Sequence, residues 1–440
     1  MRFGTDGVRG VANAQLTPEF ALALGRASAR VLGAGRWGIG ADTRRSGPLL
    51  AAAVAAGLAA EGAEVEDFGV LPTPGTAFWS QTTDCPAVMV SASHNPFADN
   101  GLKLFAPGGL KLSDAVQAEL EAAIDDVRRD VGDAVPTGAQ IGTVRSGDAT
   151  SAYVEHLLAT TEGRSLSGLR VVLDCANGAA SRVGPTVFER LGATVIARFD
   201  DPDGVNINEG CGSTHPEHLQ RVVVEQGADV GFAFDGDADR MLAVDAGGRL
   251  VDGDQLMAIA ALDLRERGRL AHDTVVVTVM TNLGFRLGME AAGVRVVETQ
   301  VGDRYVLEAM EAGGFVLGGE QSGHVIHRDA ATTGDGVLSA VRTADLLCRS
   351  GRGLAELADA AMVRLPQVLR NVRIDAPMPD VADRLAEPIA EARAQLGERG
   401  RVLIRPSGTE PLVRVMVEAD DEDRAAAVAG RLVDAVTALG

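Results

Sequence analysis

The chain has 440 residues, of which 46% are hydrophobic and 23% charged, and its formal net charge is −20. This length exceeds what one hydrophobic core usually supports, and the composition excludes a disordered or collagen-like protein. The negative charge, without any Lys/Arg-rich run, argues against nucleic acid as a partner, and the longest uncharged apolar stretch, residues 46–60, is too short to cross a membrane.

Short β-branched runs alternate with amphipathic helical patterns along most of the chain, which indicates an α/β protein. In the first block, the pattern predicts helices at residues 19–32 and 49–60 and strands at 38–41, 64–68 and 87–91. Thr17 and Pro18 precede the first helix as a cap and a first-turn proline.

Three further blocks follow. The pattern predicts strands at 170–173, 194–197 and 230–234 in the second block and at 275–279, 295–297 and 315–317 in the third. The last block differs, with strands at 370–374, 402–404 and 413–418 and helices at 381–396 and 424–439. We therefore expect three similar mixed α/β domains, residues 1–147, 148–248 and 249–365, and a smaller C-terminal α+β domain, residues 366–440.

The cysteines and the first residues point to a cytoplasmic protein. Cys85, Cys175, Cys211 and Cys348 lie far apart without a Cys-x-x-Cys pair, which favours neither a disulfide framework nor a zinc site. Residues 1–7 are polar and glycine-rich where a secretion signal would be apolar.

Lys103 and Lys111 are the only lysines in the chain, and all the other residues in its Lys+Arg total of 41 are arginines. Genomic composition bias is one explanation. The other is a need, at these two positions, for a compact ammonium group that a guanidinium cannot imitate.

Ser93 lies in the sequence Ser-Ala-Ser-His-Asn-Pro at residues 91–96, directly after a predicted strand. The dipeptide 95–96 and the Asp-Asn-Gly at 99–101 predict turns that fold this loop back on itself. An ordinary polar loop is the alternative, because a serine hydroxyl carries a phosphoryl group only with a base, a cation or a metal nearby.

Asp235, Asp237 and Asp239 follow the predicted strand 230–234 and precede Arg240. Carboxylates at this spacing can converge on one hard cation, and oxygen ligands select Mg²⁺ or Ca²⁺ over zinc. A calcium-binding EF-hand would need Gly at Arg240, Glu at Ala246 and flanking helices, so we expect one Mg²⁺ ion. A solvated acidic turn is the alternative, and Arg240 can stabilise charge on a transferring group.

Two other polar loops have ligand-binding compositions, with an ordinary turn as the alternative for each. Residues 405–411, Arg-Pro-Ser-Gly-Thr-Glu-Pro, suit a phosphate, which Arg405 can bind through two parallel hydrogen bonds. Residues 319–324, Gly-Glu-Gln-Ser-Gly-His, can bind sugar hydroxyls. The Gly-x-Gly-x-x-Gly at 33–38 ends a helix instead of opening one, and no Gly-Lys-Ser/Thr phosphate loop exists.

Taken together, five segments resemble the signature set of the α-D-phosphohexomutase family, in the family's order and over nearly the whole chain: residues 3–10, 91–96 with 99–103, 235–240, 319–324 and 405–411. The resemblance implies an enzyme whose three similar α/β domains and smaller C-terminal α+β domain surround a central cleft. Each domain would contribute one loop, and the C-terminal domain would be the moving lid.

The resemblance also implies roles for individual residues. Ser93 matches the phosphoserine, whose phosphate would complete the metal shell of Asp235, Asp237 and Asp239. The catalytic positions around it are matched by Arg9, His94, Lys103 and Arg240, with Lys103 as a proton shuttle. The sugar-recognition loop is matched by Glu320, Ser322 and His324, and the distal phosphate clamp by Arg405, Ser407, Gly408 and Thr409.

Within the family, Gln321 and residues 206–215 and 301–306 resemble the phosphoglucosamine mutase branch, whereas phosphomannomutase/phosphoglucomutase enzymes usually carry Met at position 321. The resemblance implies interconversion of glucosamine 6-phosphate and glucosamine 1-phosphate through a bound 1,6-bisphosphate, supplying UDP-N-acetylglucosamine and cell-wall synthesis. It is compatible with a homodimer. The alternatives are a phosphomannomutase/phosphoglucomutase on the same scaffold, a non-catalytic sugar-phosphate- or metal-binding homologue, and a phosphatase.

Overall fold

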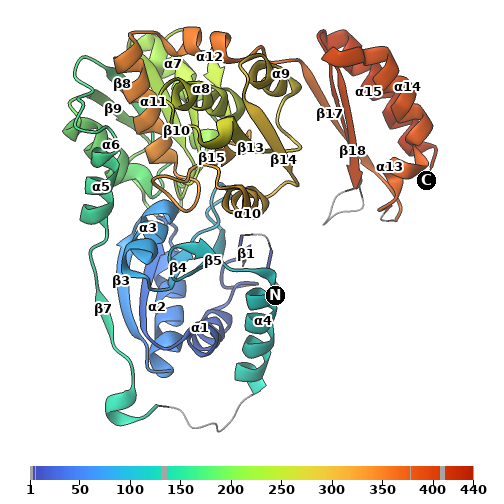
Figure 1. The fold of residues 1–440 in the computed structure, drawn as a ribbon. Coiled ribbons are helices and arrows are strands. Elements are labelled where there is room, and N and C mark those ends of the chain that lie inside the picture. The colour runs from blue at the N-terminus through green and yellow to red at the C-terminus, as the bar shows by residue number, and fades with distance from the viewer. Residues whose placement is uncertain (1–2, 5, 130–135, 377, 407–411, 440) are drawn as a thin grey trace. The chain divides into compact units, whose positions relative to one another are not determined.

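The computed structural model describes residues 3–4, 6–129, 136–376, 378–406 and 412–439. Its elements form two compact units (Figure 1). Unit 1 comprises Met1–Met280 and Arg295–Ala358, and unit 2 comprises Thr281–Val294 and Asp359–Gly440. None of the described helices combines the length and the apolar character needed to cross a membrane.

Unit 1 begins with a mixed sheet in the strand order β1-β5-β4-β2-β3-β7, with β6 paired to β5. Its strands are β1 (Val8–Val11), β2 (Arg36–Ala41), β3 (Glu64–Val70), β4 (Ala87–Val90), β5 (Asp99–Ala106), β6 (Leu110–Lys111) and β7 (Val144–Ser146). Its helices are α1 (Pro18–Leu32), α2 (Gly47–Ala60), α3 (Thr73–Thr83) and α4 (Asp114–Arg129). The predicted cap of α1 is confirmed, because the Thr17 hydroxyl accepts the N–H of Phe20 at 3.3 Å.

The second sheet of unit 1 has the order β12-β11-β10-β8-β9. Its strands are β8 (Arg170–Asp174), β9 (Thr194–Arg198), β10 (Val230–Phe234), β11 (Met241–Asp245) and β12 (Leu250–Val251), and the helices are α5 (Thr150–Ala159), α6 (Ala180–Arg190) and α7 (Glu217–Glu225).

The third sheet of unit 1 has the order β14-β13-β15-β16. Its strands are β13 (Thr274–Thr278), β14 (Arg295–Thr299), β15 (Leu317–Gly319) and β16 (Val325–His327), and the helices are α8 (Gly253–Glu266), α10 (Asp303–Gly313) and α11 (Gly336–Ser350). Helix α12 (Leu354–Ala361) begins in unit 1 and ends in unit 2.

The three predicted chemical loops of unit 1 occupy the same topological position, one in each sheet. They are residues 91–98 between β4 and β5, 235–240 between β10 and β11, and 320–324 between β15 and β16. In each case, the strand before the loop runs parallel to a neighbour and the strand after it runs antiparallel to the strand before. Each loop therefore leaves the carboxyl end of a parallel strand, where open α/β sheets place their binding residues.

Unit 2 contains an antiparallel sheet in the order β17-β19-β18, covered by helices on one face (Figure 1). The strands are β17 (Gln367–Arg373), β18 (Arg401–Pro406) and β19 (Leu412–Glu418), and the helices that cover them are α13 (Val381–Arg384), α14 (Ala386–Leu396) and α15 (Glu422–Thr437). Helix α9 (Leu283–Ala291) also belongs to unit 2. Val413, Val415 and Val417 alternate along β19 and pack with Val428 and Leu432 of α15 in one apolar core. The predicted class, three similar α/β domains followed by a smaller α+β domain, is confirmed.

Two local predictions were wrong. Residues 99–101, expected as a turn, begin strand β5, and Gly101 pairs with Arg9 of β1. Only a glycine fits at position 101, since a Cβ there would lie 2.4 Å from the carbonyl oxygen of Ser91. The helix expected over 381–396 is divided at Leu385 into α13 and α14, because Pro388 has no N–H and its ring would clash with the carbonyl of the residue four positions earlier.

Candidate active site

Ser93 lies in the loop between β4 and β5 and is only 1% exposed. Its hydroxyl donates a hydrogen bond of 2.6 Å to Asp235 Oδ2. Its φ of 54° lies in the left-handed region, which costs an L-residue about 1 kcal/mol or more. Such strain persists only where the surroundings fix it, and it is concentrated at functional sites.

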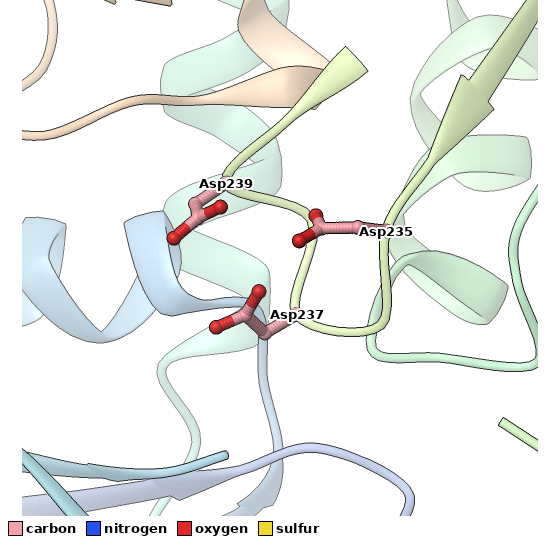
Figure 2. Close-up of side chains that lie close together, drawn as sticks. All are labelled: Asp235, Asp237 and Asp239. Atoms are coloured by element: carbon pink, nitrogen blue, oxygen red, sulfur yellow. The ribbon is translucent and has the colours of Figure 1, made fainter. Parts of the chain in front are cut away.

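Asp235, Asp237 and Asp239 point their carboxylates toward one another (Figure 2). Their ligand atoms all lie within 4.8 Å of each other, and all three residues are buried. Oδ1 of Asp237 and Oδ1 of Asp239 have no hydrogen-bond partner among the described residues. Buried carboxylate oxygens without partners are costly, and a hard divalent cation would satisfy them. The three residues therefore fit a metal site.

Burial raises the pKa of Asp235 well above its usual range, and the neighbouring carboxylates of Asp239 and Asp237 raise it further. This is the expected result when acidic groups share a small buried space.

Gly236 allows the aspartate loop to pack directly on the Ser93 loop. A Cβ at this position would lie 2.7 Å from the carbonyl oxygen of Ser93. The loop is also fixed from two other sides, since the carbonyl of Asp237 accepts the N–H of Thr73 and that of Ala238 accepts the N–H of Gly336, both at 3.0 Å. The spacing of the carboxylates is therefore held by glycine contact and by backbone hydrogen bonds.

Lys103 is the buried cation of this centre. Its Nζ lies 2.8 Å from Asp237, 3.2 Å from Asp239 and 2.9 Å from Asp6. Burial acts to lower the pKa of Lys103, but these carboxylates outweigh it and raise the pKa well above the usual value. Lys103 is therefore firmly protonated.

Asp6 connects both lysines of the chain. Besides Lys103, it pairs with Lys111 at 2.6 Å and with Arg9 at 2.7 Å. Lys111 also pairs with Asp303, at the start of α10. Although burial opposes ionisation, the three cations hold the pKa of Asp6 well below its usual range.

His94 connects Ser93 to Arg240. Its Nδ1 lies 3.3 Å from the hydroxyl oxygen of Ser93 and 3.2 Å from Nη1 of Arg240. Because a guanidinium only donates, this nitrogen is an acceptor. Burial, Arg240 and Arg9 lower the pKa of His94 to about 4, so the imidazole is neutral at neutral pH.

A cavity of about 490 Å³ in unit 1 brings predicted residues of the first three domains together. This volume suits a small-molecule ligand. Its walls include Asp6, Arg9, Asp239, Arg240, Asp303, Glu320 and His324. Ser322 is not part of this lining, and its hydroxyl oxygen is buried without a partner among the described residues.

In unit 2, Arg405 lies on β18 directly opposite Arg414 of β19. Nε of Arg405 is buried and has no hydrogen-bond partner in the described part of the chain. Burial and the charge of Arg414 lower the pKa of Arg405. The other predicted clamp residues, Ser407, Gly408 and Thr409, lie outside the described residues.

The roles of Asp6, Asp303 and Arg44 were not predicted from the sequence. Asp6 and Asp303 stand inside segments that carried the family resemblance, and the rarity of lysine already singled out their partner Lys111. Arg44 had no such signal, because it is one of many arginines. Its guanidinium contacts the Ser93 loop because the fold brings these two distant parts of the sequence together.

Four models of the phosphoglucomutase/phosphomannomutase family match the chain: alpha/beta/alpha domain I over residues 1–130, domain II over 151–248, domain III over 252–365 and the C-terminal domain over 357–435. The phosphoglucosamine mutase of Streptomyces griseus is 55% identical over 100% of this chain and 99% of its own length. The chain belongs to the phosphoglucosamine mutase family.

Solved structures agree with this membership. A phosphoglucomutase/phosphomannomutase family protein from Burkholderia thailandensis matches with a TM-score of 0.81 at 25% identity, over 98% of this chain and 97% of that one. The N-acetylphosphoglucosamine mutase of Aspergillus fumigatus, crystallised with GlcNAc-6P and magnesium, matches in fold with a TM-score of 0.71 at 20% identity, over 99% and 95%. As a member of the phosphoglucosamine mutase family, the chain is an enzyme, an isomerase of the phosphohexomutase class.

Proposed function

We propose that this enzyme interconverts glucosamine 6-phosphate and glucosamine 1-phosphate, with Ser93 carrying the transferable phosphoryl group. The observation that carries the proposal is the 2.6 Å hydrogen bond from the Ser93 hydroxyl to Asp235, inside a buried site of three converging aspartates. The name of the relative from Streptomyces griseus supports the choice of substrate. The reaction would supply UDP-N-acetylglucosamine and cell-wall synthesis.

The aspartate site supports one Mg²⁺ as cofactor, and the Aspergillus fumigatus enzyme was crystallised with magnesium. Asp235, Asp237 and Asp239 would hold the ion together with a phosphate oxygen on Ser93. When bound, it would act as a Lewis acid that neutralises charge on the transferring phosphoryl group.

In the first half-reaction, the bond between phosphorus and Ser93 Oγ breaks and a bond to O1 of glucosamine 6-phosphate forms. The substrate hydroxyl loses one proton and the serine oxygen gains one, so the protons balance. His94 is placed to orient Arg240 beside the serine, since its neutral Nδ1 lies 3.3 Å from Ser93 Oγ and 3.2 Å from Arg240 Nη1. The product of this step is glucosamine 1,6-bisphosphate.

The bisphosphate then turns end for end, and the 6-phosphoryl group returns to Ser93. Arg9, Arg240 and Lys103 provide fixed positive charge in both half-reactions, because phosphoryl transfer depends mainly on positioning and electrostatics. The three carboxylate partners of Lys103 favour this fixed charge over the proton shuttle expected from the resemblance. Glu320, Ser322 and His324 would bind the sugar, and Arg405 with residues 407–409 would hold the other phosphate.

The experiment combines turnover with phosphosite analysis. Enzyme primed with labelled glucose 1,6-bisphosphate should carry the label on Ser93 and convert glucosamine 6-phosphate to glucosamine 1-phosphate. Removing metal with EDTA should abolish turnover, and added Mg²⁺ should restore it. Ser93→Ala should lower kcat by about 10⁴-fold or more, whereas Ser113→Ala, at an exposed serine, should not.

Each competing function has its own outcome in this assay. A higher kcat/KM for glucose or mannose phosphates would indicate a phosphomannomutase/phosphoglucomutase, and release of inorganic phosphate in step with substrate loss would indicate a phosphatase. A protein that never acquires label would be a binding homologue. Substantial mutase activity in Ser93→Ala would refute the phosphoserine assignment.

A further inference from the structure

The loop that carries Ser93 folds around one buried guanidinium. Arg44 follows strand β2, and its side chain is 0% exposed. Its Nη2 donates to the carbonyls of Ser93 and Asn95, both at 2.8 Å, and its Nη1 donates to the carbonyls of Asp99, at 3.0 Å, and Pro96. One side chain therefore fixes the backbone of the loop at four points.

The same guanidinium is linked to the backbone N–H of Ser93. Arg44 Nε donates to Asp42 Oδ2 at 2.8 Å, and this oxygen also accepts the Ser91 hydroxyl at 2.6 Å. The Ser91 oxygen in turn accepts the N–H of Ser93 at 2.9 Å. Both backbone polar groups of Ser93 are therefore held by one closed network, and its positive charge is balanced by Asp42.

Asn208 holds the loop from the second domain. Its Nδ2 donates to the carbonyls of Ser93, at 2.9 Å, and Asn95, at 3.1 Å, which are also the acceptors of Arg44 Nη2. The Ser93 carbonyl therefore accepts hydrogen bonds from two buried side chains. This is the kind of over-determined environment that keeps a residue in a strained backbone conformation such as the φ of 54° at Ser93.

We propose that Arg44 is a positioning residue, which holds Ser93 in the left-handed conformation that directs its hydroxyl toward the aspartates. This inference rests on the proposed function, in which that hydroxyl carries the phosphoryl group. The Arg44 side chain is 0% exposed and donates to Asp42 and to the loop carbonyls, so it acts through the peptide of Ser93 and not on the substrate. Lysine cannot replace it, because a guanidinium spreads five N–H donors in a fixed plane whereas an ammonium group donates from a single point.

The test is Arg44→Lys, with Arg164→Lys as the matched control. Arg164 pairs with the buried Asp345, away from the Ser93 loop, at 2.7 Å. Each variant is primed with glucose 1,6-bisphosphate, and kcat is expressed per molecule phosphorylated on Ser93, as counted by intact mass. A displacement of about 1 Å at a reacting group costs roughly 100-fold in rate, so Arg44→Lys should lower this kcat by about 30- to 100-fold with KM within about 2-fold of wild type.

A merely structural role would reduce the number of phosphorylated molecules but leave their kcat unchanged, and that result would overturn the inference. If Arg44→Lys does not fold, Asn208→Ala decides, because it removes hydrogen bonds to the same two carbonyls. It should lower kcat by about 10-fold with KM unchanged, and a wild-type kcat would refute positioning by this network. Turnover by wild-type enzyme that carries no phosphate on Ser93 would instead refute the proposed function.

Discussion

The positive charges near Ser93 are paired with carboxylates, whereas those on strands β18 and β19 face each other. In unit 1, the buried Lys103 is in contact with the carboxylates of Asp6, Asp237 and Asp239. In unit 2, Arg405 stands opposite Arg414, and within the described residues neither pairs with a carboxylate.

This difference separates a centre that is organised in advance from one that a ligand would complete. Opposite charges in a buried cluster hold one another in place without substrate, whereas like charges directly opposite in a sheet are unfavourable until an anion lies between them. We therefore expect substitutions of charged residues in the first region to lower the free energy of unfolding strongly, and those in the second region to change it little.

The largest expected effect is that of Lys103→Gln. It leaves the carboxylates of Asp6, Asp237 and Asp239 without their buried cation, so the free energy of unfolding should fall by about 3–5 kcal/mol. Urea denaturation in EDTA measures it, with Arg405→Gln as the matched control, for which we expect a change below about 0.5 kcal/mol. Equal losses in the two variants would contradict the comparison.

Substitution of one glycine in each unit tests the same difference between the two regions. Gly236→Ala places a Cβ 2.7 Å from the Ser93 carbonyl oxygen, so the two loops must separate and kcat should fall by about 100-fold. Gly430→Ala, on an exposed position of α15 with no atom within 4 Å of the new Cβ, should instead raise the free energy of unfolding by about 0.5–1 kcal/mol and leave kcat unchanged. Normal turnover in Gly236→Ala would show that the loop contact is not needed.

A smaller effect is expected from the backbone of Ser93 itself. Ser93→Gly and Ser93→Ala both remove the hydroxyl, but only glycine adopts a φ of 54° without strain. The glycine variant should therefore be more stable than the alanine variant by about 1 kcal/mol in chemical denaturation. A more stable alanine variant would argue that the left-handed conformation is not strained.

The smallest effect concerns the arginine pair. Arg414→Gln removes a like charge opposite Arg405 and should stabilise β18 and β19 by about 0.5 kcal/mol, as measured by amide hydrogen exchange. Inorganic phosphate should slow exchange in these strands of the wild type more than in the variant. Faster exchange in Arg414→Gln without phosphate would mean that the pair is not repulsive.

The sequence predicted the parts of the site whose determinants are local. Asp235, Asp237 and Asp239 share one turn after a buried strand, so their convergence follows from their spacing and from the end of β10. The strands that were predicted in each of the four sheets likewise lie within three residues of their predicted ends, whereas no strand was predicted at β1, β5, β6, β7, β11, β12 or β16.

The parts that depend on long-range contact could not be predicted. Arg44 meets the Ser93 carbonyl across 49 residues of sequence, and Asn208 meets it across 115. The pairing of Gly101 with Arg9 likewise made an expected turn part of strand β5, because its partner β1, the edge strand of the first sheet, lies far from β5 in the chain. The division of the expected helix 381–396 at Leu385 was different, because it has a local cause in Pro388. The helical pattern of the surrounding residues was given more weight than this proline.

The burial of both lysines of the chain in one centre has a further consequence. Both contact Asp6, and their side chains are only 4% and 11% exposed. Acylating reagents need an accessible, unprotonated amine, so every lysine acylation in this protein would record an opening of this one centre. Time-resolved acylation followed by mass spectrometry would therefore measure how often this centre opens, without an engineered label.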